Sequence, residues 1–231
     1  MCSIVLINRL LTDTPLLVAA NRDEKLDRPA SGPRVETDAP ITRIRPVDES
    51  QGGTWLGLNA MGVFAGITNR FMAPTDPQRH SRGSLPLQAL EEPSARMAAN
   101  RIASIDPSAY NAFHLVMADP QDAWVVWSDG AQLQRENLLP GIHVITESSY
   151  GAGEDKRRAY LLRRAREVTE NSDAVVDDLR RLRLAVVLGL CFCLHLRLDL
   201  GQVCAAVERT DVELELRLPI DCRRRCRRRR G

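Results

Sequence analysis

The sequence predicts an α+β protein, and three observations support this fold class. Apolar, β-branched runs come in pairs separated by short turn segments, which is typical of antiparallel hairpins. A helical stretch lies between two such pairs, and another follows the last strand. The composition, 44% hydrophobic and 27% charged over 231 residues, is that of an ordinary globular protein. We therefore expect helices packed on layers of antiparallel sheet.

The predicted strands follow one another along most of the chain. They are residues 3–10, 16–20, 53–58, 63–68, 113–118, 123–128 and 141–146. Turn residues join the first two at 12–15 and the next two at 60–62, so we expect two hairpins in one antiparallel sheet. Residues 28–46 are rich in Pro and small polar residues, which predicts a long loop with at most one short strand.

Two helical regions complete the pattern. Residues 85–105 favour two helices, with a break at 93–94 and an end at 106–107. Residues 154–170 predict an exposed amphipathic helix, because apolar residues recur among Arg and Glu. These apolar residues are Tyr160, Leu161, Leu162 and Val168.

We expect two regions, a domain over residues 1–180 and an atypical Arg- and Cys-rich tail over residues 181–231. The tail has 12 Lys or Arg against 6 Asp or Glu, and five of the six cysteines. It lacks the Cys-X2-Cys spacing of zinc sites and has one histidine, His195, so we expect no metal. Two interpretations stay open: a poorly ordered basic tail, or out-of-frame translation of a GC-rich gene, since the chain has 30 Arg and 2 Lys.

Charge and hydropathy narrow the classes of partner. Residues 1–180 carry 20 Lys or Arg against 24 Asp or Glu, which gives no reason to expect nucleic acid. The apolar run 185–194 is shorter than the roughly 20 residues that span a bilayer. Because no secretory signal is visible either, we expect a cytoplasmic protein without a membrane span. The expected partner is a small-molecule substrate or ligand, and the oligomeric state stays open.

Cys2 is the most informative residue, because removal of Met1 would make it N-terminal. It would then carry a thiol and an α-amine that titrates at about 7.7–8.0, a nucleophile and a base on one residue. The first hairpin places Cys2 opposite roughly residues 22–25, so Arg22 or Asp23 could reach the thiol, depending on register. A nearby arginine would lower the thiol pKa, and an aspartate could orient the amine. The alternative is a small buried cysteine at a strand start.

Six short sequence motifs occur in a fixed order along the chain, and accidental agreement at all six is improbable. They are Met1-Cys2; Ala19-Ala20-Asn21-Arg22-Asp23-Glu24 followed by Arg28-Pro29; Gly52-Gly53-Thr54-Trp55-Leu56-Gly57; Phe64-Ala65-Gly66-Ile67-Thr68-Asn69; Ser81-Arg82-Gly83; and Tyr110-Asn111-Ala112-Phe113. Together they closely resemble the NRDE family, also called the transport and Golgi organisation 2 family, over roughly residues 1–165. That family resembles the N-terminal nucleophile (Ntn) hydrolases, which implies a four-layer αββα sandwich.

The resemblance also implies roles for eight residues. Cys2 would be the nucleophile and its α-amine the general base, with Arg22 and Asp23 beside the sulfur. Asn69 would donate to an oxyanion, a contribution of roughly 2.7–4 kcal/mol. The substrate-binding residues would be Asn21, Glu24, Trp55 and Asn111.

Structural alternatives stay open for several of these residues. Arg22 and Asp23 could form a partly buried ion pair, and Asn69 could cap backbone groups in a turn. Trp55 could belong to the core or to a pocket wall. His114 and His143 fall in strand-like runs, where we expect satisfied core or surface histidines.

Two function classes follow from the resemblance. The first is an N-terminal-cysteine amidohydrolase of small amides, which needs no cofactor. The alternative is a non-enzymatic haem or acyl-CoA/lipid carrier, with Cys2, His114 and His143 as candidate haem ligands. Two departures from the family pattern bear on both classes. Residues 145–148 replace a Leu-Ser-Asn-like segment, and a late Gly-Thr-Arg strand is missing from residues 166–231, so we expect a sandwich that is incomplete at the C-terminus, with an exposed sheet edge.

Overall fold

The computed structural model describes residues 2–11, 14–25, 27–71, 75–153 and 156–170. The predicted tail, with its cysteine spacings, its basic run and the question of reading frame, lies outside the described residues. The predicted C-terminal incompleteness of the sandwich also concerns residues outside them.

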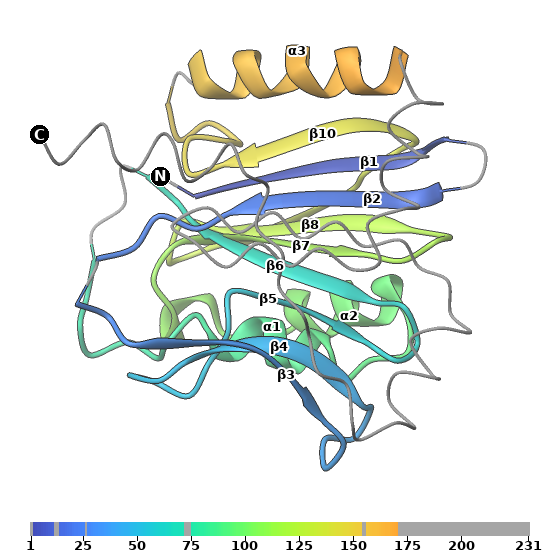
Figure 1. The fold of residues 1–231 in the computed structure, drawn as a ribbon. Helices are drawn as coiled ribbons and strands as arrows, with labels where there is room; N and C mark the ends of the chain where they lie inside the picture. The colour runs from blue at the N-terminus through green and yellow to red at the C-terminus, as the bar shows by residue number, and fades with distance from the viewer. Residues whose placement is uncertain (1, 12–13, 26, 72–74, 154–155, 171–231) are drawn as a thin grey trace, which may run out of the picture.

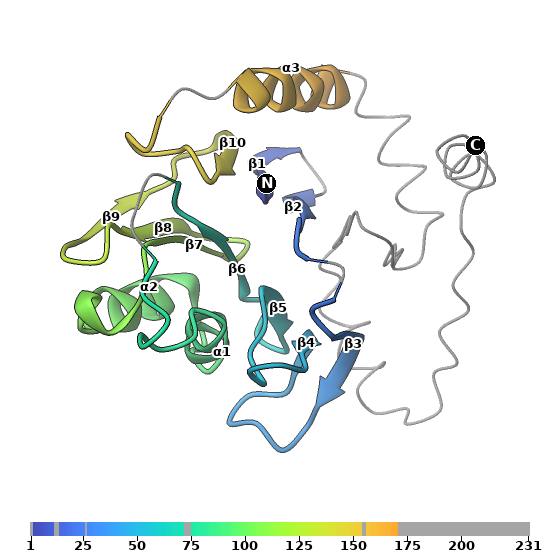
Figure 2. The same ribbon diagram turned by 90° about the vertical axis from the view of Figure 1, so that its left-hand side faces the viewer.

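Two antiparallel sheets lie between two layers of helix (Figure 1, Figure 2). The first sheet has the order β10 (Gly141–Thr146), β1 (Ser3–Leu11), β2 (Thr14–Asn21). The second has the order β3 (Ala30–Glu36), β4 (Arg43–Asp48), β5 (Leu56–Asn59), β6 (Phe64–Asn69), β7 (Phe113–Ala118), β8 (Ala123–Ser128), β9 (Leu133–Asn137). Helix α3 (Lys156–Glu170) packs on the first sheet, and α1 (Ser84–Ala89) and α2 (Ala95–Ala103) pack on the second. This αββα order confirms the predicted fold class.

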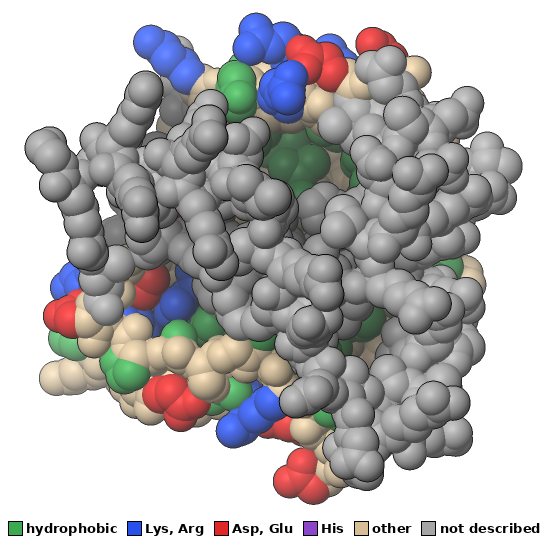
Figure 3. Space-filling view, viewed as in Figure 1, with side chains coloured by type: hydrophobic (Ala, Val, Ile, Leu, Met, Phe, Trp, Pro, Cys, Tyr) green, Lys and Arg blue, Asp and Glu red, His purple; other side chains and the backbone are tan. Residues whose placement is uncertain are grey.

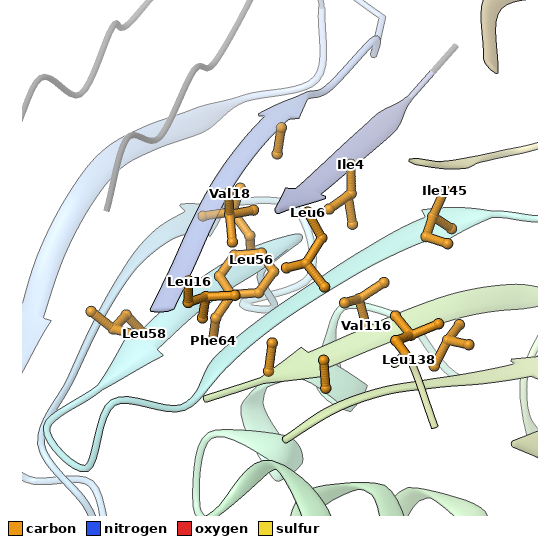
Figure 4. Packing of buried hydrophobic residues seen from close by; sticks show 14 of the residues in the cluster. Ile4, Leu6, Leu16, Val18, Leu56, Leu58, Phe64, Val116, Leu138 and Ile145 are labelled. Atoms are coloured by element: carbon orange, nitrogen blue, oxygen red, sulfur yellow. The ribbon is translucent and has the colours of Figure 1, made fainter. Parts of the chain in front are cut away.

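The core between the sheets follows from the two-residue period of strands, which sends alternate side chains to opposite faces. Ile4 and Leu6 of β1 and Leu16 and Val18 of β2 are buried and point toward the second sheet (Figure 4). Their partners from the second sheet include Leu56, Leu58, Phe64, Val116 and Leu138 (Figure 4). Residues that alternate with these, such as Ala65 and Met117, belong to a second core against α1 and α2.

Gly66 on β6 marks a close approach of the two sheets. A Cβ atom at this position would lie 3.0 Å from Ile4 Cδ1 and 2.7 Å from Phe64 Cζ. Any side chain would have to displace these core groups. Glycine is therefore required here for sheet packing rather than for backbone freedom.

The predicted long loop over residues 28–46 is wrong, because β3 and β4 form a hairpin at one edge of the second sheet. Glu36 on β3 accepts hydrogen bonds from Arg45 at 2.6 Å and from Arg43 at 2.8 Å. These bonds, above all that from Arg45, lower the pKa of Glu36 to about 2. Ion pairs thus join β3 to β4. These strands lack the alternation of apolar and polar residues by which a strand is recognised in a sequence.

Two further expectations about the sheets are corrected. Strand β9 was not predicted; it forms the other edge of the second sheet, and three of its five residues are exposed. The hairpins β1–β2 and β5–β6 lie in different sheets, so the prediction of one shared sheet is wrong. Pairing within a sheet and packing across two sheets bury the same alternate residues, and the sequence pattern cannot distinguish them.

The other predicted elements are confirmed. The strands at 113–118, 123–128 and 141–146 have the predicted bounds. The helices α1 and α2 are separated at residues 90–94, where Ser94 caps α2 by accepting a hydrogen bond from the Met97 N–H at 3.3 Å.

Helix α3 confirms the predicted exposed amphipathic helix but buries a different stripe. Ala165 is buried and Leu161 and Leu162 are half-buried, whereas Tyr160 is 53% exposed. Charged side chains, most of them Lys or Arg, gather over α3 at the top of Figure 3. Among the helices of the described residues, none has the length and apolar character needed to span a membrane.

Candidate active site

Three strand ends meet at one end of the first sheet, where β1 begins. Ser3 at the start of β1 pairs with Asn21 at the end of β2 and with Thr146 at the end of β10. Continuing the β1–β2 register by one residue places Cys2 opposite Arg22. The predicted position of Cys2 opposite residues 22–25 is confirmed.

Cys2 is held at both its backbone nitrogen and its sulfur. Its N–H donates to Glu147 Oε1 at 3.2 Å, and its thiol donates to the Asp23 carbonyl oxygen at 3.7 Å. Burial raises the pKa of the thiol, the bond to Asp23 opposes this rise, and the negative charge of Glu147 adds to it. Arg22 acts to lower the thiol pKa, but burial outweighs it. The expected direction of the Arg22 effect is confirmed, but the net thiol pKa is raised because burial is the largest cause.

Arg22 lies against an aromatic ring rather than in contact with the sulfur. Its guanidinium carbon is 4.0 Å from the centre of the buried Trp55 ring, a cation–π contact. Its ion-pair partner is Glu24 at 3.4 Å, where the sequence suggested Asp23. Glu24 also pairs with Arg28 at 3.4 Å, and Arg28 binds Asp48 at 2.5 Å. Arg22 and Glu24 of the NRDE string thus belong to one network of ion pairs with Arg28 and Asp48.

The loop that carries Glu147 is fixed by contacts from the second sheet. The Phe71 N–H, just beyond β6, donates to the Glu147 carbonyl oxygen at 2.7 Å. Arg70 Nη2 donates to the Tyr150 carbonyl oxygen at 2.9 Å, and the Tyr150 ring stacks on Trp127 at 4.2 Å. These contacts hold Tyr150 at a backbone φ of 54°, a sparsely populated region for a bulky residue.

His114 completes this support from inside the sandwich. It is fully buried, and its Nε2 donates to the Ser149 carbonyl oxygen at 3.0 Å while its Nδ1 accepts from Thr68 Oγ1 at 3.2 Å. Burial lowers the pKa of His114 to about 4, so the ring is neutral near neutral pH and keeps its one proton on Nε2. The expectation of a satisfied core histidine is confirmed.

The three candidate haem ligands do not share a pocket among the described residues. Both ring nitrogens of His114 are engaged inside the core. His143 lines a cavity of about 390 Å³ at the outer edge of β10, where its Nε2 is 2.7 Å from the Leu139 carbonyl oxygen. Cys2 does not line this cavity. The haem carrier stays a prediction that this geometry does not support.

The remaining predicted site residues lie in different settings. Asn69 is exposed at the end of β6, and within the described part of the chain its side chain makes no hydrogen bond. Asn21 ends β2 with a buried Oδ1 that finds no hydrogen-bond partner there. Asn111 clamps a loop instead, since its Oδ1 accepts from the Asp76 N–H at 2.8 Å and its Nδ2 donates to the Asp76 carbonyl oxygen at 2.7 Å. Their roles toward a substrate stay predictions.

Arg82 and Glu147 were not predicted as site residues. Both nevertheless lie in segments that the sequence pattern singled out. Arg82 belongs to the Ser-Arg-Gly string, and Glu147 lies where the family pattern departs. Glycine contacts fix the position of Arg82: a Cβ on Gly53 would lie 2.7 Å from the Gly83 carbonyl carbon, and the Thr54 N–H donates to the Gly83 carbonyl oxygen at 3.0 Å. The Gly-Gly and Ser-Arg-Gly strings are therefore packed against each other.

Comparisons of sequence point to one family. The family model described as Transport and Golgi organisation 2 matches residues 1–186. The bovine Transport and Golgi organization protein 2 homolog is 30% identical over 139 residues, covering 58% of this chain and 50% of the relative. The human homolog is 31% identical over 109 residues, 45% of this chain and 38% of the relative. The matched part of the chain thus spans half or less of these relatives.

Comparison of structures points to an Ntn-hydrolase-like fold. The chain resembles a Caenorhabditis elegans N-acylethanolamine-hydrolyzing acid amidase ortholog with a TM-score of 0.53. The two share 12% sequence identity over 73% of this chain and 79% of that chain. At this identity the likeness concerns the fold alone.

Proposed function

The chain belongs to the Transport and Golgi organisation 2 family, and from this premise and the geometry around Cys2 we propose that it is an N-terminal-cysteine amidohydrolase of a small amide. One observation supports the proposal above the others. The Cys2 nitrogen, which becomes an α-amine when Met1 is removed, is 3.2 Å from the Glu147 carboxylate. A general base thus has a fixed orientation beside its own thiol.

The reaction runs through a thioester on Cys2. The α-amine takes the thiol proton, and the thiolate attacks the amide carbon, forming a C–S bond and an oxyanion. Collapse of this intermediate breaks the C–N bond, and the leaving amine takes the proton from the α-ammonium group. Water, deprotonated by the α-amine, then hydrolyses the thioester, which releases the acid and restores the thiol.

The Glu147 carboxylate and the Asn69 amide have complementary parts in this scheme. Glu147 stabilises the α-ammonium form by charge and hydrogen bonding, so the amine can hold the proton between the two steps. Asn69 ends β6 two residues before Phe71, whose N–H binds the Glu147 carbonyl oxygen. Its side chain is exposed, so its N–H groups can donate to the oxyanion.

Exposure of the Cys2 amine tests the proposal directly. Protein that begins at Cys2 should hydrolyse N-acyl amide probes, and protein with a retained N-terminal extension should not. Cys2→Ala should abolish turnover, whereas Cys191→Ser, outside the described residues, is the control. Intact mass would show which N-terminus each sample has. Full turnover by protein that retains Met1 would refute the mechanism.

The haem or acyl-CoA carrier predicts a different result. Titration with haem, followed by its Soret band, would show saturable binding that is lost in Cys2→Ala, without hydrolysis of any amide. We expect hydrolysis instead, because Cys2 lies beside a carboxylate that orients its nitrogen rather than in a pocket shared with a histidine.

A further inference from the structure

Arg82 is a half-buried cation whose charge is not neutralised by any ion pair in the described part of the chain. Its Nη1 donates to the Ala112 carbonyl oxygen at 2.8 Å, and no carboxylate lies within ion-pair distance among those residues. The neighbouring carboxylates are engaged elsewhere. Glu24 pairs with Arg22 and Arg28, and Glu147 accepts from the Cys2 N–H. A partly desolvated charge without an ion-pair partner costs free energy, so this position favours an anion.

A path of hydrogen bonds leads from the Arg82 side chain to the loop that holds the Cys2 nitrogen. The Ala112 carbonyl oxygen that accepts from Arg82 also accepts from the Arg70 N–H at 3.2 Å. The next residue, Phe71, donates to Glu147, whose side chain holds the Cys2 nitrogen. Short contacts therefore connect the guanidinium to the nucleophile.

The electrostatics of Arg82 agree with this placement. Burial lowers the pKa of Arg82, Arg28 acts in the same direction, and Cys2 and Glu147 act against it. The Cys2 thiol cannot supply the missing negative charge in this state, because burial keeps it protonated. An anionic group of a ligand can.

The platform that carries Arg82 is fixed before any ligand binds. The Leu85 N–H donates to the Arg82 carbonyl oxygen at 3.0 Å, and Ser84 Oγ donates to the Ser81 carbonyl oxygen at 2.9 Å. The contact between Gly53 and Gly83 fixes the same turn from the other side. A guanidinium held in this way binds a carboxylate with a small loss of conformational entropy.

We propose that Arg82 forms an anion subsite beside Cys2 and that the substrate is an amide carrying a carboxylate. This inference rests on the amidohydrolase function proposed above. The carboxylate can stand on the amine part or on the acyl part of the amide, and the two placements are distinguished by the choice of probe.

Two matched pairs of probes test the subsite. Hexanoylglycine and hexanoylglycinamide differ in a carboxylate on the amine side, and succinyl and butyryl p-nitroanilides differ on the acyl side. We expect kcat/KM to favour the carboxylate in one pair by about 10- to 100-fold, the range of a charged hydrogen bond. The ratio of kcat/KM for the charged probe to kcat/KM for its neutral partner should fall close to one in Arg82→Gln. In the parent protein the same ratio should shrink as salt is added. The exposed Arg96, mutated to Gln, is the control and should retain it.

Failure of the subsite and failure of the enzyme give different results. Hydrolysis without a charge preference in either pair, or with a preference that Arg82→Gln retains, would overturn the subsite and leave the amidohydrolase intact. If no probe is hydrolysed, calorimetry on the Cys2→Ala protein decides: binding of hexanoylglycine or of succinyl p-nitroanilide that Arg82→Gln abolishes supports the subsite, and binding of neither refutes it. If Arg82→Gln does not fold, Arg82→Lys replaces it, with a preference expected to be reduced because the planar fork is lost.

Discussion

At the scale of single residues, burial raises the pKa of the Cys2 thiol, and the charges of Glu147 and Arg22 have smaller effects on it. Arg22 is 4.0 Å from the Trp55 ring centre and pairs with Glu24, so its charge is shared. Glu147 contacts the Cys2 nitrogen and raises the thiol pKa. The carboxylate that contacts the Cys2 nitrogen thus lies just beyond β10 rather than in the NRDE string.

Glu147→Gln should separate thiol reactivity from turnover. The amide keeps an acceptor for the Cys2 nitrogen but removes the negative charge, so we expect the thiol pKa to fall and alkylation by iodoacetamide near neutral pH to speed up. Amide hydrolysis should nevertheless fall, roughly 10- to 100-fold, because the α-ammonium form loses its counter-charge. The pH dependence of alkylation and kcat/KM measure the two effects.

A control and a contrary outcome complete this prediction. Glu49→Gln removes an exposed carboxylate that bonds to Ser31 and should change neither quantity. If Glu147→Gln slowed alkylation and hydrolysis together, Glu147 would have only a structural part at this site.

At the scale of elements, the loop after β10 is positioned by side chains of β6, β7 and β8. His114 bonds to the Ser149 carbonyl oxygen of this loop, and Thr68 bonds to His114. Trp127 stacks on the Tyr150 ring of the same loop. The loop therefore depends on the second sheet although its strand belongs to the first. His114 makes this dependence sensitive to acid.

The stability of the protein should fall as the pH drops from 6.5 toward 4. The pKa of His114 is about 4 in the folded protein, against an ordinary value of 6.5 for an exposed histidine, so only the unfolded chain binds the extra proton in this window. The neutral ring contributes stability above pH 6.5, and about 3 kcal/mol of it should be lost as the pH falls through the folded pKa. Urea unfolding at pH 7.5 and at pH 4.5 measures the change.

Histidine variants isolate this contribution from that of other titrating groups. His114→Gln should show a smaller loss between the two pH values than the parent protein. The exposed His80 is the control, and His80→Gln should show the full loss. An equal loss in all three proteins would mean that His114 is not responsible.

The elements missed from the sequence share a physical cause. β3 and β9 are the two edges of the second sheet, so each pairs on one side only and neither needs a continuous apolar face. β3 is joined to its neighbour through Glu36, Arg43 and Arg45. The confirmed central strands β7 and β8 are buried on both faces and read as apolar runs.

At the scale of the whole molecule, the site exists because two sheets are held face to face. Cys2 immediately precedes β1 of the first sheet, whereas Trp55 precedes β5 and Asn69 ends β6 of the second sheet, and Arg82 lies in the turn before α1. The apolar core between the sheets supplies the free energy that keeps these groups together.

Phe64→Ala should weaken this core and the site together. Phe64 is fully buried between the sheets, so we expect a loss of about 3–5 kcal/mol in the free energy of unfolding, measured with urea. Amide hydrolysis at 25 °C should fall with the folded fraction. Tyr160→Ala, on the exposed face of α3, is the control and should change stability by less than about 0.5 kcal/mol. A loss below 1 kcal/mol for Phe64→Ala would contradict the sandwich core.

Local chemistry in the sequence determined the α+β class, the central hairpins, the helices and the position of Cys2 opposite the NRDE string. Each of these depends on neighbours along the chain or across one turn, and periodicity records such neighbours directly. The resemblance to a family extended them to the αββα order, which the structure confirms.

Only the tertiary structure decided which sheet each hairpin joins, that the polar edge strand β3 pairs through arginines, and that Glu147 contacts Cys2. Glu147 lies 145 residues from Cys2 in sequence, yet its carboxylate contacts the Cys2 nitrogen. Contacts between residues so far apart in the sequence follow from how the two sheets pack. The burial of a side chain between the sheets is likewise a property of the whole folded chain rather than of one segment. The pKa of Cys2 is raised for the same reason, since burial outweighs the nearby arginine.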